Sequence, residues 1–520
     1  MKLKKILILP VLFFAFSVLA QKIPENALKS ITSQELFDHV KYLASDEMRG
    51  RDTPSPELKK CAEYIANEFK SYGLTSTFKN TDYFQVFNCL KNKLDMTETG
   101  NGLPNKFAII DNGKKEEFVI KSDFLPHFLT SDGEITAEIV FAGYGITAPE
   151  YKYDDYKNID VKGKIVLVMR REPQEKDSTS IFAGKAETSY SKTEYKYKNA
   201  VNHGAAGFMI VRAPSEAGRR PPMIWPSLMR RSSGTVPLTL DLGKGSDIPA
   251  VFIHKTIADR IVQNSGKTLK QIQAEIDKDF VPRSFAVTQL KVHITSQLIR
   301  TKLPTQNVIA FIEGSDPVLK NEVVIMCAHY DHIGVRNDSI YNGADDNASG
   351  TAGVMELAEA FSKCEKRPKR SLLFMAFAGE EKGLFGARFY AANPMFPLKK
   401  TAAVLNIDMM GRNDPNEITL IGTEYNPDLK AISVKANEQI GLNLEFIPQS
   451  PFVGSDHQPF RDRLVPVLWY YSKDSGDTHQ PTDDYFRILP GKMEKVTRLV
   501  FVTAWLAANT DKMPEALPYQ

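Results

Sequence analysis

Residues 323–331 have the sequence VVIMCAHYD, an apolar run that ends in histidine and aspartate. Apolar residues without polar alternation indicate a strand buried on both faces, which is typical of a parallel sheet covered by helices. Three more strands of this kind follow in the chain. They are predicted at Ser371–Ala378, Ala402–Ile407 and Val465–Tyr471.

Segments with helical periodicity separate and follow these strands. They are predicted at Thr351–Phe361, Gly383–Ala392, Pro427–Gln439 and Lys492–Ala508. Strands that alternate with helices predict an α/β domain with a mostly parallel mixed sheet sandwiched by helices. We assign residues 301–512 to this domain.

Two helices are predicted earlier, at Gln34–Ala44 and Glu57–Tyr72, and the second places apolar residues at three- and four-residue spacing. We assign residues 21–90 as the N-terminal helical part of the same domain.

Residues 91–300 contain short runs typical of strands, which are broken by Gly, Pro and Asp. This pattern predicts a separate β-rich insert. Its strands are predicted at Phe118–Ile120, Ile135–Phe141, Lys164–Met169, Gly207–Val211 and Ala250–Ile253. One helix-like stretch is expected at Ala200–Gly207. Arg212–Ser246 is rich in Pro, Gly, Ser and Arg, which predicts a long loop.

The first twenty residues are predicted to be a secretory signal peptide, because three lysines precede the apolar run Ile6–Ala20. Cleavage is expected after Ala20. The alternative is a membrane anchor, but the run is shorter than the roughly 20 residues that span a bilayer. We therefore expect export to the periplasm or the medium, without stable membrane insertion.

Composition narrows the function further. The chain has 520 residues and a net charge of +3, and no basic stripe interleaved with aromatic residues indicates nucleic-acid binding. Of the four cysteines, Cys61 and Cys89 could pair in an exported protein, and the sequence leaves this open.

The strongest functional signal is the residues that follow the predicted strands. His329 and Asp331, Glu380 and Glu381, Asp408, and, after a short loop, His479 all come after such a strand. The carboxyl ends of strands in an open α/β sheet form one edge where ligands bind. Histidine and carboxylate side chains gathered there predict a metal site.

Local spacing suggests individual roles. His329 and Asp331 project to the same side of extended backbone, so Asp331 can accept the second N–H of a metal-bound imidazole. The loop Gly343–Gly350 offers a carboxylate that can bridge two cations while its neighbours cap the next helix. Of two adjacent glutamates, one can bind metal while burial raises the pKa of the other towards that of a general base.

These motifs resemble the di-zinc aminopeptidases typified by aminopeptidase Y and the bacterial leucyl aminopeptidases. The matching stretches are His329–His332, Gly343–Gly350, Ala378–Glu381, Asn406–Asp408 and His479. Val140–Met169 resembles the protease-associated domain that is often inserted in such peptidases.

The resemblance implies a role for each matching residue. Asp346 bridges two Zn²⁺ ions, His329 and Asp408 complete one, and Glu381 and His479 complete the other; Co²⁺ or Mn²⁺ are possible substitutes. Glu380 is the general base and Asp331 orients His329. The family often has a cis peptide after the bridging aspartate, here Asp346–Asn347.

Substrate-binding residues are less well marked. Asp456 lies in a segment that the family has near its pocket. Many relatives have tyrosine where this chain has Thr478, so Tyr470 or Tyr471 become candidates to polarise the substrate carbonyl.

The function expected is an exported metallo-aminopeptidase that hydrolyses N-terminal residues from peptides through a metal-bridging hydroxide. Three alternatives stay open, of which one is a carboxypeptidase that acts on acidic substrates. A glutaminyl cyclase has a related fold with typically one zinc, and a non-catalytic binding protein would resemble the transferrin receptor ectodomain.

Overall fold

The computed structural model describes residues 22–76, 83–97, 104–182, 188–216, 238–243, 247–447 and 454–518. The predicted signal peptide therefore lies outside the described residues.

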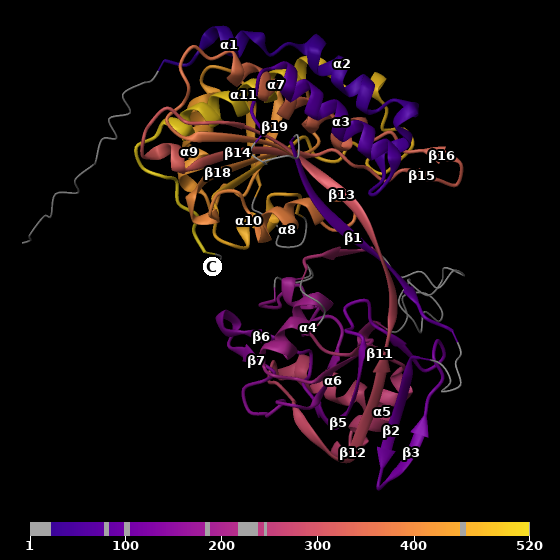
Figure 1. Cartoon of the computed structure of the whole chain (residues 1–520). Helices are drawn as coiled ribbons and strands as arrows, with labels where there is room; N and C mark the ends of the chain where they lie inside the picture. The colour runs from indigo at the N-terminus through magenta and orange to yellow at the C-terminus, as the bar shows by residue number, and fades with distance from the viewer. Residues whose placement is uncertain are drawn as a thin grey trace, which may run out of the picture.

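A nine-stranded mixed sheet forms the centre of the larger domain (Figure 1). Its strands, in spatial order, are β10 (Thr239–Asp241), β1 (Phe84–Leu94), β13 (Leu298–Ile312), β17 (Ser371–Phe377), β14 (Val323–His329), β18 (Thr401–Ile407), β21 (Val467–Tyr471), β19 (Glu417–Ile421) and β20 (Asn443–Ile447). The four central strands β17, β14, β18 and β21 run parallel. Because every residue of β14, β17 and β18 is buried, these strands are apolar along almost their whole length.

Helices cover both faces of this sheet, and strand alternation divides the core between them. One face packs against the helices α1 (Glu25–Ser30), α2 (Ser33–Leu43), α3 (Pro56–Ser71), α7 (Gly350–Ser362), α9 (Pro427–Asn437) and α11 (Pro490–Asn509). The opposite face packs against α8 (Phe385–Ala392) and α10 (Gln458–Arg461). The α/β sandwich predicted from the sequence is confirmed.

Side-chain caps fix the start of the N-terminal helices. The hydroxyl of Thr32 accepts a hydrogen bond from the backbone N–H of Glu35 at the start of α2. Ser55 does the same for Leu58 at the start of α3, with Pro56 as the first helical residue. These helices place the short 3₁₀ segment η1 (Asp46–Arg51) against the central strands.

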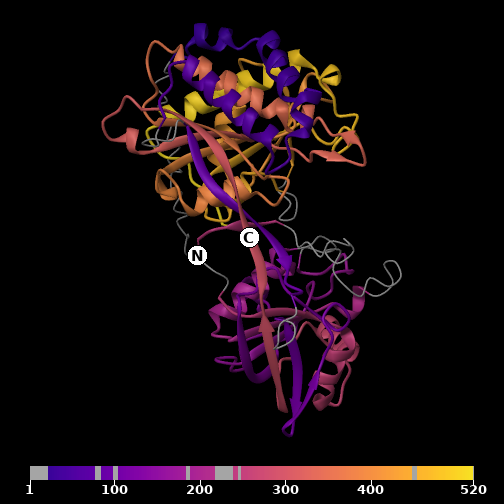
Figure 2. The same ribbon diagram turned by 45° about the vertical axis from the view of Figure 1, so that its right-hand side comes forward.

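The insert is a second domain with its own eight-stranded sheet and its own core. Its strands, in spatial order, are β3 (Lys114–Glu117), β2 (Lys106–Asp111), β12 (Phe285–Ser296), β5 (Gly133–Phe141), β8 (Ile165–Met169), β9 (Gly207–Val211), β11 (Ala250–Ile253) and β4 (Phe124–Pro126). Its helices are α4 (Thr193–Asn202), α5 (Lys255–Val262) and α6 (Leu269–Asp279). The long paired strands β1 and β13 lead from one domain to the other (Figure 2).

Several short elements complete the two domains. The short strands are β6 (Thr147–Ala148), β7 (Tyr153–Asp154), β15 (Val335–Arg336) and β16 (Ser339–Ile340). The remaining single-turn helices outside the site are η2 (Pro149–Tyr151), η3 (Ser189–Ser191), η4 (Pro214–Glu216), η6 (Gln263–Ser265), η7 (Leu319–Asn321), η9 (Leu398–Lys400) and η10 (Tyr485–Arg487).

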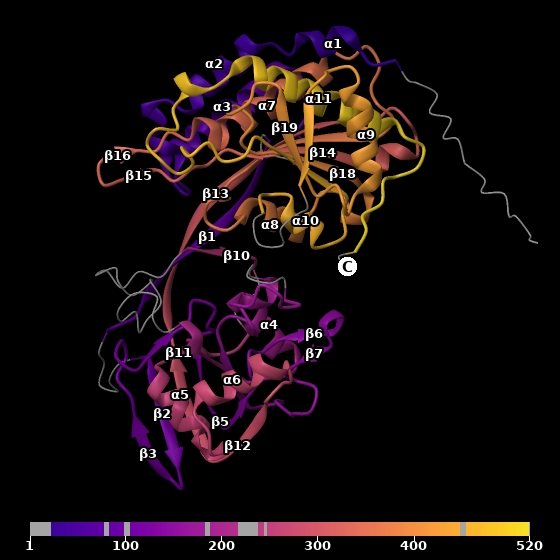
Figure 3. The same cartoon turned by 180° about the vertical axis from the view of Figure 1, so that it is seen from behind.

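Three predictions within the insert were wrong. Phe118–Ile120 is not a strand, because the hairpin of β2 and β3 ends at Glu117 and the chain then turns. The helix predicted over Ala200–Gly207 is α4, which begins at Thr193 and ends at Asn202. The loop predicted over Arg212–Ser246 contains β10, which pairs with β1 at the edge of the larger sheet (Figure 3); residues 217–237 and 244–246 lie outside the described part.

The four cysteines are free thiols, so Cys61 and Cys89 do not form the disulfide that the sequence left open. Within the described ranges, no helix is both long enough and apolar enough to cross a membrane.

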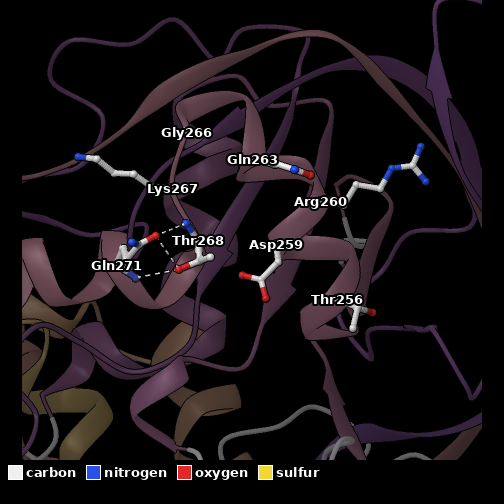
Figure 4. A pocket seen from close by; sticks show the side chains of 8 residues that line it. All are labelled: Thr256, Asp259, Arg260, Gln263, Gly266, Lys267, Thr268 and Gln271. Carbon is white, nitrogen blue, oxygen red and sulfur yellow. Dashed lines mark hydrogen bonds between the residues drawn. The ribbon is translucent and has the colours of Figure 1, made fainter.

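The insert also carries a hollow of about 620 Å³ beside α5 and α6 (Figure 4). It is lined by Thr256, Asp259, Arg260, Gln263, Gly266, Lys267, Thr268 and Gln271. Its two cations are already paired, Lys267 with Glu275 and Arg260 with Glu116. The carboxylate of Asp259 is paired with Lys255, so each charged side chain that lines the hollow has an ion-pair partner.

Candidate metal centre

The candidate site lies at the carboxyl ends of the parallel strands. His329 is the last residue of β14, and Asp408 comes directly after β18. Glu380 and Glu381 follow β17 after a turn at Gly379, whose φ of +76° favours glycine. Asp346 lies in η8 (Ala344–Ser349), the irregular turn that leads into α7.

One group of donors surrounds His329. Its Nε2 atom lies 3.3 Å from Oδ1 of Asp408 and 3.4 Å from Oδ1 of Asp346. Glu380 belongs to the same group, because donor atoms of His329, Glu380 and Asp408 lie within 4.8 Å of one another. The imidazole is almost fully buried, so these oxygens contact it inside the protein and not at the surface.

A second group surrounds His479. Its Nε2 atom lies 3.3 Å from Oδ2 of Asp346 and 3.0 Å from Oε2 of Glu381. Asp346 thus turns one carboxylate oxygen to each group, which is the arrangement a bridging ligand needs. The five predicted ligands therefore lie close together, with Asp346 between the two groups.

The position of Asp346 is set by the backbone around it. The carboxylate of Asp483 accepts hydrogen bonds from the backbone N–H of Asp345, at 2.9 Å, and of Asp346, at 3.0 Å. The Asp346–Asn347 peptide bond is cis, as the resemblance implied. The amide of Asn347 donates to the carbonyl of Ile407, at 2.9 Å, which ties this turn to the end of β18.

Asp331 acts on His329 through a different atom from the one predicted. The backbone carbonyl of Asp331 lies 3.1 Å from Nδ1 of His329, whereas its carboxylate is 3.8 Å away. The carboxylate instead accepts from the backbone N–H of Glu380, at 3.1 Å, and from the hydroxyl of Thr53, at 3.0 Å. The side chain of Asp331 therefore orients the Glu380 segment.

A buried arginine from the N-terminal part supports the same region. Arg51 is fully buried, and its guanidinium donates to the carbonyl oxygens of Tyr330, at 2.9 Å, Asn342, at 2.7 Å, and Gly343, at 2.9 Å. It also donates to the carbonyl of Leu43. Arg51 thus joins the end of β14 to the loop that leads to Asp346.

The loop that carries His479 is held by Asp477. This carboxylate accepts from Arg412, at 2.7 Å, from Arg487, at 3.2 Å, and from the hydroxyl of Thr482. Because the side chain of His479 is half-exposed, these contacts fix its position more than core packing does. Thr478 points to Asp474 and takes no part in the site.

The two adjacent glutamates have opposite electrostatic surroundings. Burial raises the pKa of Glu380 well above its usual value, and the neighbouring carboxylates of Asp408 and Asp456 raise it further. Burial also acts on Glu381, but its contacts with His332 and His479 outweigh burial and lower the pKa of Glu381. Glu381 therefore remains ionised while Glu380 is suited to take up a proton.

Two predicted substrate-binding residues offer no surface to a substrate. Tyr470 is fully buried, and its hydroxyl contacts Ser433 of α9. It therefore lies on the face of the sheet that α9 and α11 cover. Asp456 is also fully buried. Tyr471 faces the opposite side of β21 from Tyr470 and is half-buried, and burial together with the charges of Asp408 and Asp474 raises its pKa to about 12.

Sequence reasoning gave no role to His332. Its Nδ1 atom lies 2.9 Å from Oε1 of Glu381, and its donor atom belongs to the group of Asp346, Glu381 and His479. The signal was present in the sequence, because His332 follows His329 by three residues in the same strand-end stretch.

Comparison with protein-family models assigns both domains. Residues 307–504 match the model of peptidase family M28, and residues 135–261 match that of the PA domain. The first match contains every candidate metal ligand described above, and the second match lies within the insert.

The curated relatives are distant. Aminopeptidase YwaD of Bacillus subtilis is 24% identical over 72% of this chain and 70% of its own length. A probable zinc metalloprotease of Leptosphaeria maculans is 29% identical over 39% of this chain, and leupeptin-inactivating enzyme 1 of Streptomyces exfoliatus is 33% identical over 32%. The matches span 54% and 35% of the lengths of the last two relatives.

Among solved structures, the aminopeptidase from Aneurinibacillus sp. strain AM-1 is similar in fold. The comparison has a TM-score of 0.51 at 21% identity and covers 96% of this chain and 98% of the other.

Proposed function

Because residues 307–504 belong to peptidase family M28 and a PA domain precedes them, we propose that this chain is an exported aminopeptidase that uses two zinc ions. Its substrates would be peptides, from which it would hydrolyse the N-terminal residue. The relatives named for zinc and for aminopeptidase activity support this choice of chemistry.

The main observation in support of the proposal is that Asp346 lies between the two groups of candidate metal ligands. Its Oδ1 atom is 3.4 Å from His329 and its Oδ2 atom is 3.3 Å from His479. Two imidazoles and three carboxylates are ligands that zinc accepts, and buried carboxylates this close together are costly without cations. The residues present therefore fit a pair of zinc ions.

His329, Asp346 and Asp408 would hold one ion, and Asp346, Glu381 and His479 the other. Zinc supplies a Lewis acid for the peptide carbonyl and lowers the pKa of water. Co²⁺ or Mn²⁺ would substitute, since the same ligands suit them.

Glu380 would move the proton. Its backbone is held in place by the hydrogen bond from its N–H to Asp331, and burial raises the pKa of its carboxyl. A carboxylate of raised pKa can accept a proton from water and return it to the leaving amine. Its neighbour Glu381 stays ionised and is suited to bind metal.

The activity is tested with a panel of aminoacyl p-nitroanilides, alone and N-acetylated. We expect hydrolysis of the free-amine compounds, loss of hydrolysis after a zinc chelator, and recovery when zinc is added back. Acetylation should abolish cleavage, since it removes the N-terminal amine. Equal cleavage of both forms would rule out an aminopeptidase.

The same assay addresses the alternatives. A glutaminyl peptide included in the panel would cyclise if the chain were a glutaminyl cyclase. A non-catalytic binding protein would leave every compound intact while still binding zinc.

Export is the second part of the proposal and stands on the leader-like pattern of residues 1–20. We expect N-terminal sequencing of the protein from its native host to begin at Gln21, in the periplasmic or culture fraction. A mature chain that begins at Met1 and stays in the cytoplasm would contradict it.

A further inference from the structure

His332 is a fully buried histidine at the candidate site that the five-ligand scheme does not use. Its Nδ1 atom lies 2.9 Å from Oε1 of Glu381 and 3.7 Å from Oδ2 of Asp346. Its ring packs edge-on against that of His479, with centroids 5.5 Å apart. The ring therefore lies on the His479 side of Asp346.

Neither ring nitrogen of His332 makes a hydrogen bond with the residues that the structure describes. The 2.9 Å contact with Glu381 has the length of a hydrogen bond without its direction. A buried polar group without a partner costs roughly 1–3 kcal/mol. An unpaired buried nitrogen needs an explanation. Beside a candidate metal site, coordination of a metal ion through the nitrogen lone pair provides one.

The spacing of the donors suits one ion. Tetrahedral zinc with bonds of about 2.0–2.1 Å keeps its donors roughly 3.3 Å apart. Here His332 lies 2.9 Å from Glu381 and 3.7 Å from Asp346, and His479 lies 3.0 Å and 3.3 Å from the same two residues. These separations range from 2.9 to 3.7 Å and include the tetrahedral value.

Gly343 makes the space for this ring. A Cβ atom at Gly343 would lie 2.5 Å from Cγ of His332 and 2.3 Å from the carbonyl oxygen of Asp346. The φ of Gly343 is +58°, a conformation that side chains disfavour. The chain therefore lets the imidazole approach Asp346 as closely as a fellow ligand would.

We propose that Nδ1 of His332 is a fourth protein ligand of the metal position formed by Asp346, Glu381 and His479. This inference rests on the proposed function, because it assumes that metal binds there. The two positions then differ: one has four protein donors, as closed structural zinc sites have, and the other keeps a coordination place free. The four-donor position should hold its ion longer.

X-ray absorption of the unmodified zinc-loaded protein tests the ligand count without any substitution. The proposal predicts three imidazoles over two zinc ions, from His329, His332 and His479. Two imidazoles over two ions would overturn it while leaving the proposed function intact. Absence of bound zinc would instead contradict the proposed function itself.

His332→Ala provides the second readout, with His39→Asn as the matched control. His39 is also buried in this domain, but it contacts Glu356 and Tyr64, away from the site. Titration with a competing chelator should show that the tightest zinc is held more than about 100-fold more weakly in His332→Ala, beyond the 10–100-fold typical of a residue that only orients a ligand. His39→Asn should bind zinc as the unmodified protein does. Unchanged zinc affinity in folded His332→Ala would overturn the proposal.

Discussion

Both domains contain buried parallel strands, and they differ in the residues that follow those strands. In the peptidase domain, the parallel strands β14, β17 and β18 lead into His329, Glu380 and Asp408. In the PA domain, β8 and β9 are likewise buried, parallel and apolar, yet they lead into Arg170 and Arg212. The same edge therefore carries histidine and carboxylate side chains in one domain and arginines in the other.

The arginines at this edge of the PA domain are engaged with an acidic partner. Arg170, Arg171 and Arg212 all contact the buried carboxylate of Glu216. The side chains at this edge of the PA domain form ion pairs with one another. At the corresponding edge of the peptidase domain, carboxylates lie around histidines. A parallel sheet supplies the place for a site, and the residues after the strands decide whether metal chemistry is possible there.

The largest expected difference is between two glutamates, one in each domain. Glu380→Gln removes the proposed base and should lower kcat by roughly 10²–10⁴-fold while both zinc ions stay bound. Glu172→Gln replaces a buried glutamate of the PA domain that accepts from the backbone N–H of Thr188, and should leave kcat unchanged. Steady-state kinetics with metal analysis measures both. Full turnover in Glu380→Gln would remove this residue from the mechanism.

A second comparison concerns the zinc affinity of variants at two buried aspartates, one in each domain. Asp346→Asn should weaken zinc binding more than about 100-fold, because one carboxylate serves both groups of donors. Asp155→Asn in the PA domain leaves the buried Lys196 without its neighbouring charge and should lower the free energy of unfolding by about 3 kcal/mol with zinc binding intact. Chelator titration and thermal unfolding distinguish the effects. Equal zinc affinity in the two variants would contradict the bridging role.

Two fully buried arginines compare the two ends of the peptidase sheet. Arg51 binds carbonyls near Asp346, whereas Arg370 pairs with Glu322 and donates to the carbonyl of Thr510 at the opposite end. Replacing either by methionine should cost about 3 kcal/mol of unfolding free energy, because buried carbonyls lose charged donors. Arg51→Met alone should also weaken zinc binding, about 10-fold. If both variants lost the same amount of zinc affinity, Arg51 would affect zinc binding only through the stability of the fold.

The smallest effect concerns acid stability of the PA domain. Burial lowers the pKa of His127 from 6.5 to about 3. Between these values the unfolded chain binds a proton that the folded chain does not, so stability falls as pH drops below about 6.5. From pH 7 to pH 5 this amounts to about 2 kcal/mol.

His127→Gln should remove that part of the pH dependence, and His203→Gln, at an exposed site of the same domain, should keep it. Denaturant unfolding at pH 5 and pH 7 gives the two slopes. An unchanged slope in His127→Gln would contradict the assignment to this histidine.

The sequence predicted the parts of the fold that depend on local pattern. The central strands, such as β14, were predictable because both faces are buried and their residues are almost all apolar. Phe118–Ile120 has the same residue types, but the hairpin before it ends at Glu117, which depends on pairing with β2. β10 is three residues long and half-buried, so it has no pattern of its own.

The site was predictable where a donor directly follows a strand, as with His329 and Asp408. Tyr470 offers no surface to a substrate, because alternation along β21 turns it towards α9 and turns Tyr471 to the other side of the sheet. Arg51 and Thr53 could not be assigned, since they reach Tyr330 and Asp331 only through tertiary packing.

The central claim is that Asp346 joins two metal positions at the carboxyl ends of these strands. Anomalous diffraction at the zinc edge from crystals of the zinc-loaded protein tests it most directly. We predict two peaks about 3.5–4 Å apart, one against His329 and Asp408 and the other against Glu381 and His479, with Asp346 in contact with both. A single peak, or peaks that do not contact Asp346, would contradict the account.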